Sequence, residues 1–195
     1  MAERRQGKAL EDAILNTAWA ELIANGYAAL TMSDIAKKAK TNKNTIYRRW
    51  PSKPELIMAT ISCHIDGDPF MTPDTGALAT DLEQLYRQFI PIVAVPPVGT
   101  WQKLIPEAIL TTQGQVGEIV SAINETNFIT SAVTEILAQA RLRNEPVRAN
   151  IGAEQLMLPG LLLINQLLYS GDITVSRIHT LVECVLLPVF MHESK

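Results

Sequence analysis

The 195-residue sequence contains few cysteines and no long apolar run. Its two cysteines, Cys63 and Cys184, are too few for a disulfide framework and form no CxxC pair, so we expect two reduced and buried thiols. No stretch approaches the length of a membrane helix, and the charged start of the chain has no apolar run before its first acidic cluster. We therefore expect no membrane helix, no signal peptide and a cytoplasmic protein.

Sequence patterns of catalysis and cofactor binding are also missing. The chain has no glycine-rich phosphate loop and no conspicuous pair of carboxylates, and neither His179 nor His192 has a nucleophile close to it in the sequence. The segment CHIDGD, residues 63–68, gathers a histidine and two aspartates, but its spacing fits no zinc or calcium motif. We therefore expect no enzyme activity, no cofactor and no metal site.

Apolar residues make up 47% of the chain, which is enough to bury the core of one large domain or of two small ones that share an interface. Charge is divided unevenly. Residues 1–55 hold ten Lys or Arg and six Asp or Glu, whereas residues 56–195 hold seven and fourteen. Seven of the seventeen cationic side chains lie within residues 31–57. This asymmetry indicates that the N-terminal part faces a polyanion, although a cationic run is also typical of a solvated helix face.

Apolar residues recur at intervals of three and four near the start of the chain, as they do along one face of a helix. We expect a first helix from Leu10 to Asn25-Gly26, which is a usual stop signal. Its inward-facing side chains are expected to be Leu10, Ile14, Leu15, Ala18, Trp19, Leu22 and Ile23.

Three further helices are expected to follow, each capped by a polar residue at its N-terminus. Thr31 caps the first of them, and Asp34 stands in its capping-box position. Asn42 caps the second, and Ser52 caps the third, which runs to about Ile65. The inner face of the helix that Thr31 caps is expected to consist of Met32, Ile35, Ala36 and Ala39.

The first two of these helices, joined by a three-residue turn, have the proportions of a helix-turn-helix. An α-helix fits the major groove of B-DNA, where Arg and Lys pair with guanine, Asn pairs with adenine, and hydroxyl groups and Lys hold phosphates. The second helix offers such groups at Lys43, Asn44, Thr45, Tyr47, Arg48 and Arg49. Ile46 and Trp50 are expected to lie in the core. An ordinary three-helix cluster with a polar surface has the same spacing and charge, so it stays open as an alternative.

The run LTMSDIAKKAKTNKNTIYRRWPSKPELI resembles the DNA-binding domain of the TetR family (TetR/AcrR-like) of bacterial one-component regulators. Within it, TIYRRWPSK is similar to the family's recognition helix and the start of its fourth helix, and AILNTAWAELIANGYAAL fits the first helix. The resemblance covers about residues 9–60 without a gap. It implies an all-α protein with a helix-turn-helix domain, residues 1–52, and a helical effector-binding and dimerisation domain, residues 53–195.

The resemblance also implies a function and roles for individual residues. The expected function is that of a transcriptional regulator, most often a repressor, that a small molecule releases from a palindromic operator. Tyr47 and Lys53 are implied as phosphate contacts, and Thr45 is implied to lie close to the DNA backbone or a thymine methyl group. The full set of expected DNA-binding residues is Thr41, Asn42, Lys43, Asn44, Thr45, Tyr47, Arg48, Arg49 and Lys53.

The chemistry of the side chains divides part of this set further. Lys43, Asn44 and Arg48 are the candidates for reading base edges, while Arg49 is either a phosphate anchor or a surface charge.

The sequence departs from the family at the turn, where Lys40-Thr41-Asn42 replaces the usual Gly-Val-Ser. If Lys40 takes the left-handed conformation that glycine normally supplies, it costs roughly 1 kcal/mol. We hypothesise that Lys40 adds a phosphate contact in compensation.

The remainder of the chain is expected to be helical, giving nine or ten helices in total. The expected segments are residues 75–93, 101–112, 116–124, 128–143, 153–169 and 175–190. The last two are unusually apolar, and Pro159 and Pro188 are expected to kink them. The resemblance implies that they form the interface of a homodimer.

An effector pocket is implied among apolar residues of the middle helices. The candidates are Tyr86, Phe89, Trp101, Leu104, Ile105 and Phe128, although core packing explains the same residues. They include no cationic cluster, which favours a neutral or lipophilic effector.

Two other classes of function stay open. One is a helical protein that binds or sequesters a small molecule and whose altered turn has weakened DNA binding. The other is an interaction module that presents its cationic face to an acidic protein.

Overall fold

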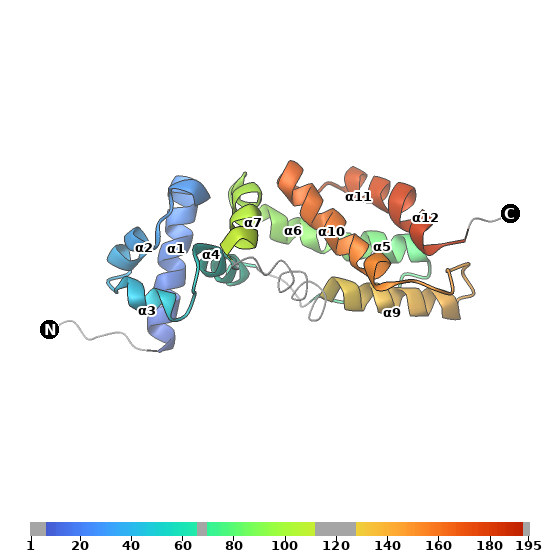
Figure 1. The fold of residues 1–195 in the computed structure, drawn as a ribbon, viewed down its shortest axis with the longest axis horizontal. Coiled ribbons are helices and arrows are strands. Elements are labelled where there is room, and N and C mark those ends of the chain that lie inside the picture. Colours follow the sequence, from blue (N-terminus) through green and yellow to red (C-terminus); the bar gives the residue numbers. More distant parts are fainter. Residues whose placement is uncertain (1–6, 66–69, 112–127, 193–195) are drawn as a thin grey trace. The chain divides into compact units, whose positions relative to one another are not determined.

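The computed structural model describes residues 7–65, 70–111 and 128–192 (Figure 1). Within these ranges the regular elements are helices, and an isolated β-bridge joins Val147 to Met191. The predicted all-α fold is therefore confirmed, while the helix expected over residues 116–124 lies outside the described residues. The elements are α1 (Lys8–Ala29), α2 (Met32–Lys38), α3 (Lys43–Tyr47), α4 (Lys53–Ser62), α5 (Leu78–Arg87), α6 (Phe89–Ala94), α7 (Thr100–Thr111), α9 (Phe128–Leu142), α10 (Ala153–Tyr169), α11 (Val175–Leu181), the π-helix η1 (Val182–Leu186) and α12 (Leu187–Phe190).

The chain divides into two compact units, called unit 1 and unit 2 below. Unit 1 contains α1 to α4 together with α7, and unit 2 contains α5, α6 as far as Val93, α9, α10, α11, η1 and α12. The structure thus groups α4 and α7 with the first three helices, a division that differs from the predicted boundary between residues 52 and 53. The assignment of effector binding and dimerisation to residues 53–195 stays a prediction.

The core of unit 1 forms around α1, against which α2, α4 and α7 pack. Ile14, Ala18 and Leu22 are completely buried, as expected from their helical spacing. Ile23 was expected to face inward, but 53% of its surface is exposed, because it lies beside the stripe that packs. Gly26 has a φ of 71°, which interrupts the helical geometry at the predicted stop, and helical hydrogen bonding resumes as far as Ala29.

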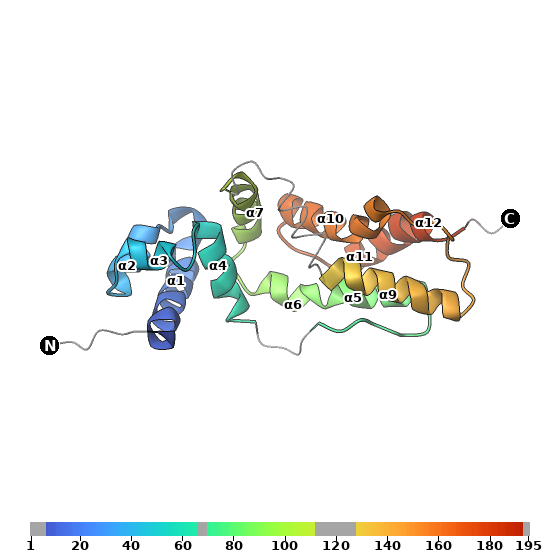
Figure 2. The ribbon, with the colours of Figure 1, turned by 60° about the horizontal axis from the view of Figure 1, so that its bottom comes forward.

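In unit 2, the single helix expected over residues 75–93 is divided into α5 and α6. Pro91 explains the break, because its ring clashes with the carbonyl group four residues earlier, at Arg87, where α5 ends. α9 lies alongside α5, and α10 packs against α9 (Figure 2).

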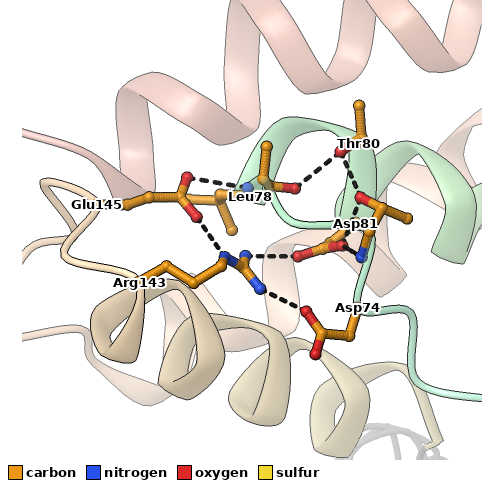
Figure 3. A network of polar contacts seen from close by, with 8 residues as sticks. Asp74, Leu78, Thr80, Asp81, Arg143 and Glu145 are labelled. Atoms are coloured by element: carbon orange, nitrogen blue, oxygen red, sulfur yellow. Dashed lines mark hydrogen bonds and ion pairs between the residues drawn. The ribbon is translucent and has the colours of Figure 1, made fainter.

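A network of charged groups joins the start of α5 to the residues just after α9 (Figure 3). The guanidinium group of Arg143 contacts three carboxylates: Asp74 at 2.7 Å, Asp81 at 2.7 Å and Glu145 at 2.9 Å. Asp81 is completely buried, and the other oxygen of the Glu145 carboxylate accepts a hydrogen bond from the backbone N–H of Leu78. Arg143 therefore ties together two segments that lie more than sixty positions apart in the sequence.

The last two predicted helices are present with one difference. α10 has the expected bounds, whereas the segment 175–190 passes through the π-helix η1 before it ends in α12. Pro188 accounts for this irregularity, because it cannot donate the backbone hydrogen bond to Cys184 that a regular helix needs. None of the described helices combines the length and the apolar character that crossing a membrane requires.

The expectation of buried cysteines is wrong. Cys63 and Cys184 are both free and exposed. Cys63 lies at the C-terminal cap of α4, and Cys184 lies on the outer side of η1, so neither faces a core.

Candidate nucleic-acid interface

α2 and α3 form the predicted helix-turn-helix, and side-chain caps fix where each helix begins. Thr31 Oγ1 accepts a hydrogen bond from the backbone N–H of Asp34 at 3.1 Å and donates one to its carboxylate at 2.6 Å. Asn42 Oδ1 accepts a hydrogen bond from the backbone N–H of Thr45 at 2.8 Å. Both predicted caps are confirmed, and they hold the turn between the helices to residues 39–42.

Lys40 adopts the left-handed conformation in this turn, with a φ of 54°. The conformation that the family assigns to glycine is thus retained without a glycine. Backbone hydrogen bonds compensate, because the N–H of Lys40 reaches the Lys37 carbonyl at 3.2 Å and that of Thr41 reaches the Ala36 carbonyl at 2.9 Å. The side chain of Lys40 is exposed, as a phosphate contact requires.

Replacing Lys40 by glycine is expected to raise the free energy of unfolding by about 1 kcal/mol, because the left-handed strain disappears. It should also reduce the slope of log affinity against log salt by about 0.9, the contribution of one phosphate contact. Urea unfolding and DNA titrations at several salt concentrations measure both effects. Lys40→Arg keeps the charge and the strain, so it should change neither quantity. An unchanged salt slope in Lys40→Gly would rule out the phosphate contact.

α3 is anchored by a single buried residue and exposes the side chains expected to contact DNA. Ile46 is completely buried, and Trp50, just beyond the helix, is 9% exposed, so the prediction that these two belong to the core is confirmed. The exposed residues of the turn and helix are Asn42, Lys43, Asn44, Tyr47 and Arg48, and Thr41, Thr45 and Arg49 are half-buried. α3 therefore presents cationic, amide and phenolic groups on its exposed side, while Ile46 faces the core on the other side.

Two of the expected DNA contacts are already engaged within the turn. Thr45 Oγ1 donates a hydrogen bond to Asn42 Oδ1 at 3.0 Å, in addition to the bond from its backbone N–H. The side-chain oxygen of Asn42 is thus used for capping. Because the Thr45 hydroxyl is also engaged, its methyl group is the part of the side chain that can contact a thymine methyl group.

Among the predicted DNA contacts, Arg49 and Lys53 each have an acidic partner. Arg49 Nε lies 3.9 Å from Glu11 of α1, a long contact that leaves Arg49 partly exposed. Lys53 Nζ lies 3.2 Å from the Glu107 carboxylate of α7, and only 17% of the Lys53 side chain is exposed. Sequence reasoning treated Lys53 as a free phosphate anchor and gave no sign of this contact, because its partner lies 54 positions away.

Comparison with known proteins decides the family. Residues 14–60 match the tetR family of bacterial regulatory proteins. An uncharacterised HTH-type transcriptional regulator of Mycobacterium bovis is 31% identical over 170 residues, which cover 84% of this chain and 79% of that protein. The chain belongs to the TetR family.

Two further comparisons agree with this assignment. The DNA-binding transcriptional repressor TetR of Mycobacteroides abscessus is 40% identical over 77 residues, which are 40% of each chain. A crystal structure described as a TetR-family transcriptional regulator from Mesorhizobium loti covers 97% of this chain and all of that one, with 19% identity and a TM-score of 0.51. This second likeness concerns the fold alone. As a TetR-family member, the chain is a helix-turn-helix regulator of transcription that binds DNA.

Three of the residues predicted to line an effector pocket lie on α7, in unit 1. Trp101 and Leu104 are buried, and Ile105 is half-buried. Because α7 packs against α1 and α4, the core of unit 1 accounts for their burial. An effector contact at these residues stays a prediction.

The other three predicted effector contacts lie in unit 2. Tyr86 is buried on α5, and its hydroxyl donates a hydrogen bond to the Pro159 carbonyl at 2.7 Å. Phe89 and Phe128 each pack against Phe70, with ring centroids 4.9 Å apart in both pairs. Tyr86 belongs to the core of unit 2, whereas the three phenylalanine rings form a partly exposed cluster. A ligand-binding role for Tyr86, Phe89 and Phe128 stays a prediction.

An ion pair on the surface of unit 2 involves one of the histidines. His179 Nδ1 lies 2.7 Å from a Glu83 carboxylate oxygen, and ligand atoms of Glu83, His179 and Glu183 lie within 4.8 Å of one another. The hydrogen bond to Glu83 raises the pKa of His179 above its ordinary value of 6.5, and the same bond lowers the pKa of Glu83. The arrangement is that of a pH-sensitive surface ion pair.

Glu83→Gln in this TetR-family chain is expected to move the titration midpoint of His179 back towards 6.5, because the neighbouring charge that favours the imidazolium form is lost. NMR titration of the ring protons measures this midpoint. Glu135→Gln, on the exposed side of α9, should leave the midpoint unchanged. If Glu83→Gln also leaves it unchanged, Glu83 does not hold the proton on His179.

Proposed function

We propose that this TetR-family regulator is a homodimeric repressor that binds a palindromic operator and is released from it by a small molecule. The observation that carries the proposal is the exposed face of α3, where Lys43, Asn44, Tyr47 and Arg48 stand clear of the core. A helix of this kind reads the edges of the bases in the major groove, and one such helix contacts one half-site.

The homodimer follows from the geometry of operator recognition. A two-fold dimer places two recognition helices about 34–36 Å apart, which matches two half-sites of a palindrome. The last helices are the proposed interface. Leu161 and Tyr169 of α10 are 42% and 81% exposed, and Val175 of α11 is 45% exposed, so this region offers apolar surface for a second copy.

Release by an effector depends on how tightly the effector binds the DNA-competent and the DNA-incompetent arrangements of the dimer. A ligand that binds the DNA-incompetent arrangement of the dimer more tightly lowers operator affinity by the ratio of its two binding constants. The proposed contacts with the effector are the apolar and aromatic candidates of the middle helices, namely Tyr86, Phe89, Trp101, Leu104, Ile105 and Phe128. Their apolar character favours a neutral or lipophilic compound.

Substitutions on α3 test the proposed division between base readers and phosphate anchors. Asn44→Ala and Arg48→Ala are expected to lower the preference for particular base pairs by about 1–3 kcal/mol each, because each removes a contact to a base edge. Tyr47→Phe removes only a phosphate donor, so it should weaken binding to all duplexes equally. Titrations against the preferred duplex and its single-base variants measure both effects. If the three variants behave alike, the division between base readers and phosphate anchors is wrong. A complex that contains one chain per palindrome would contradict the proposed dimer.

A further inference from the structure

Lys53 is the first residue of α4, and three groups surround its ammonium. Nζ lies 3.2 Å from the Glu107 carboxylate, 3.5 Å from the carbonyl oxygen of Tyr27 and 4.2 Å from the centroid of the Tyr27 ring. A carboxylate, a carbonyl oxygen and an aromatic face are each favourable partners for an ammonium. The side chain of Lys53 is therefore held inside unit 1, with 17% of its surface exposed.

Both partners are fixed by the core of unit 1. Tyr27 is 3% exposed near the end of α1, and Glu107 lies on α7, which packs against α1 and α4. Burial raises the pKa of the Tyr27 hydroxyl, and the neighbouring Glu107 carboxylate raises it further as a hydrogen-bond acceptor and as a charge, so the phenol stays neutral at physiological pH. Glu107 therefore lies beside a neutral hydroxyl group at Tyr27 and a charged ammonium at Lys53.

This arrangement sets Lys53 apart from the exposed cations of the turn and α3, while the contact of Arg49 with Glu11 is longer, at 3.9 Å. Lys40, Lys43 and Arg48 are exposed, whereas the Lys53 ammonium is already paired with an anion. A DNA phosphate offers the ammonium the same chemistry as Glu107, namely anionic oxygens that accept its N–H groups. The two anions therefore compete for one ammonium.

We propose that Glu107 is a positioning residue that holds Lys53 back from DNA, so that binding exchanges the Glu107 carboxylate for a phosphate on the Lys53 ammonium. The proposal rests on the proposed function, because it assumes that the N-terminus of α4 faces the DNA backbone. It adds a residue of α7, outside the helix-turn-helix, to the groups that set DNA affinity. Glu107 lowers affinity by stabilising the free protein.

The direct consequence concerns Glu107→Gln, which keeps the shape of the side chain and removes its charge. This variant is expected to bind DNA about fivefold more tightly than the wild type, the size of effect that a partly exposed ion pair supplies. Fluorescence anisotropy with a labelled duplex at low salt measures the change. Asp12→Asn, which neutralises an exposed acid of α1, is the control for the general loss of negative charge.

A double-mutant cycle separates competition for Lys53 from general electrostatics. The wild type, Glu107→Gln, Lys53→Met and the double variant are titrated with the same duplex; Met retains the aliphatic stem of Lys53 and so its packing. Loss of the Lys53 charge should reduce affinity about fivefold more in the Glu107→Gln background than in the wild type. In the Asp12→Asn background its effect should equal that in the wild type.

Phosphate contacts do not depend on sequence, so the cycle can be measured on any mixed-sequence duplex. Equal effects of Lys53→Met in the wild-type and Glu107→Gln backgrounds would overturn the competition, whatever the affinity of Glu107→Gln itself. That result would leave the operator-binding function intact if the wild type still prefers one duplex. Conversely, unequal effects on a protein without a preferred duplex would support the competition and contradict the proposed function. Circular dichroism of each variant confirms that it is folded before titration.

Discussion

Replacing Ile46 by alanine is expected to lower the free energy of unfolding by about 3 kcal/mol, the usual effect of removing a large aliphatic side chain from a packed core. Ile46 is the buried residue of the five-residue helix α3, and its side chain is completely inaccessible. Without it, the helix has no anchor facing α2. The exposed Asn44 and Arg48 then lose their fixed orientation, so affinity for the preferred duplex should fall more than in either Asn44→Ala or Arg48→Ala.

Two measurements check this expectation. Urea unfolding gives the loss of stability, and DNA titration at a temperature where circular dichroism shows a folded variant gives the loss of affinity. Ile46→Val is the matched control, because it removes one methyl group and should cost only about 1 kcal/mol with the base preference intact. Undiminished operator affinity in folded Ile46→Ala would show that α3 does not depend on this anchor.

Replacing Asp81 by alanine is expected to destabilise the protein by about 3 kcal/mol, because it removes the buried carboxylate of the Arg143 network. Asp81 is completely buried, accepts hydrogen bonds from the backbone N–H and the hydroxyl of Thr75, and contacts Arg143 at 2.7 Å. Alanine leaves the Thr75 N–H and part of the guanidinium without these acceptors. The connection between the start of α5 and the end of α9 should therefore loosen.

Urea unfolding measures the loss of stability in Asp81→Ala. Glu135→Ala removes an acidic side chain from the exposed side of α9 and should change stability by less than about 0.5 kcal/mol. A similarly small effect of Asp81→Ala would mean that Arg143 holds α5 and α9 together through Asp74 and Glu145 alone.

Local signals in the sequence were sufficient to predict where the helices of the helix-turn-helix begin. Thr31, Asn42 and Ser52 each accept the hydrogen bond expected of an N-cap, because a cap depends only on residues two or three positions away. The left-handed conformation of Lys40 was considered only through the resemblance, because Lys40 stands where the family usually has glycine.

Contacts between distant segments were not predictable in this way. Arg143 meets Asp74 and Asp81 across more than sixty positions, and no periodicity of apolar residues reports such a pairing. The same is true of Lys53 and Glu107 within the candidate interface. The predicted place of Lys53 in the first turn of α4 is confirmed, while its role as a phosphate contact stays a prediction. The sequence could not predict which anion lies beside it.

The break between α5 and α6 was only partly predictable from the sequence. The apolar pattern over residues 75–93 continues across Pro91 and therefore predicts one helix, although a proline is a usual helix breaker. The carbonyl group of Arg87, four residues before the proline, is where the helix ends.

The most direct test of the central claim is selection of bound duplexes from a random DNA pool by the purified protein, followed by affinity measurements for the selected duplex and for random DNA at two salt concentrations. We expect a palindromic duplex, bound far more tightly than random DNA, with log affinity falling by roughly 0.9 per phosphate contact for each unit of log salt. The absence of any enriched sequence would contradict sequence-specific recognition by α3.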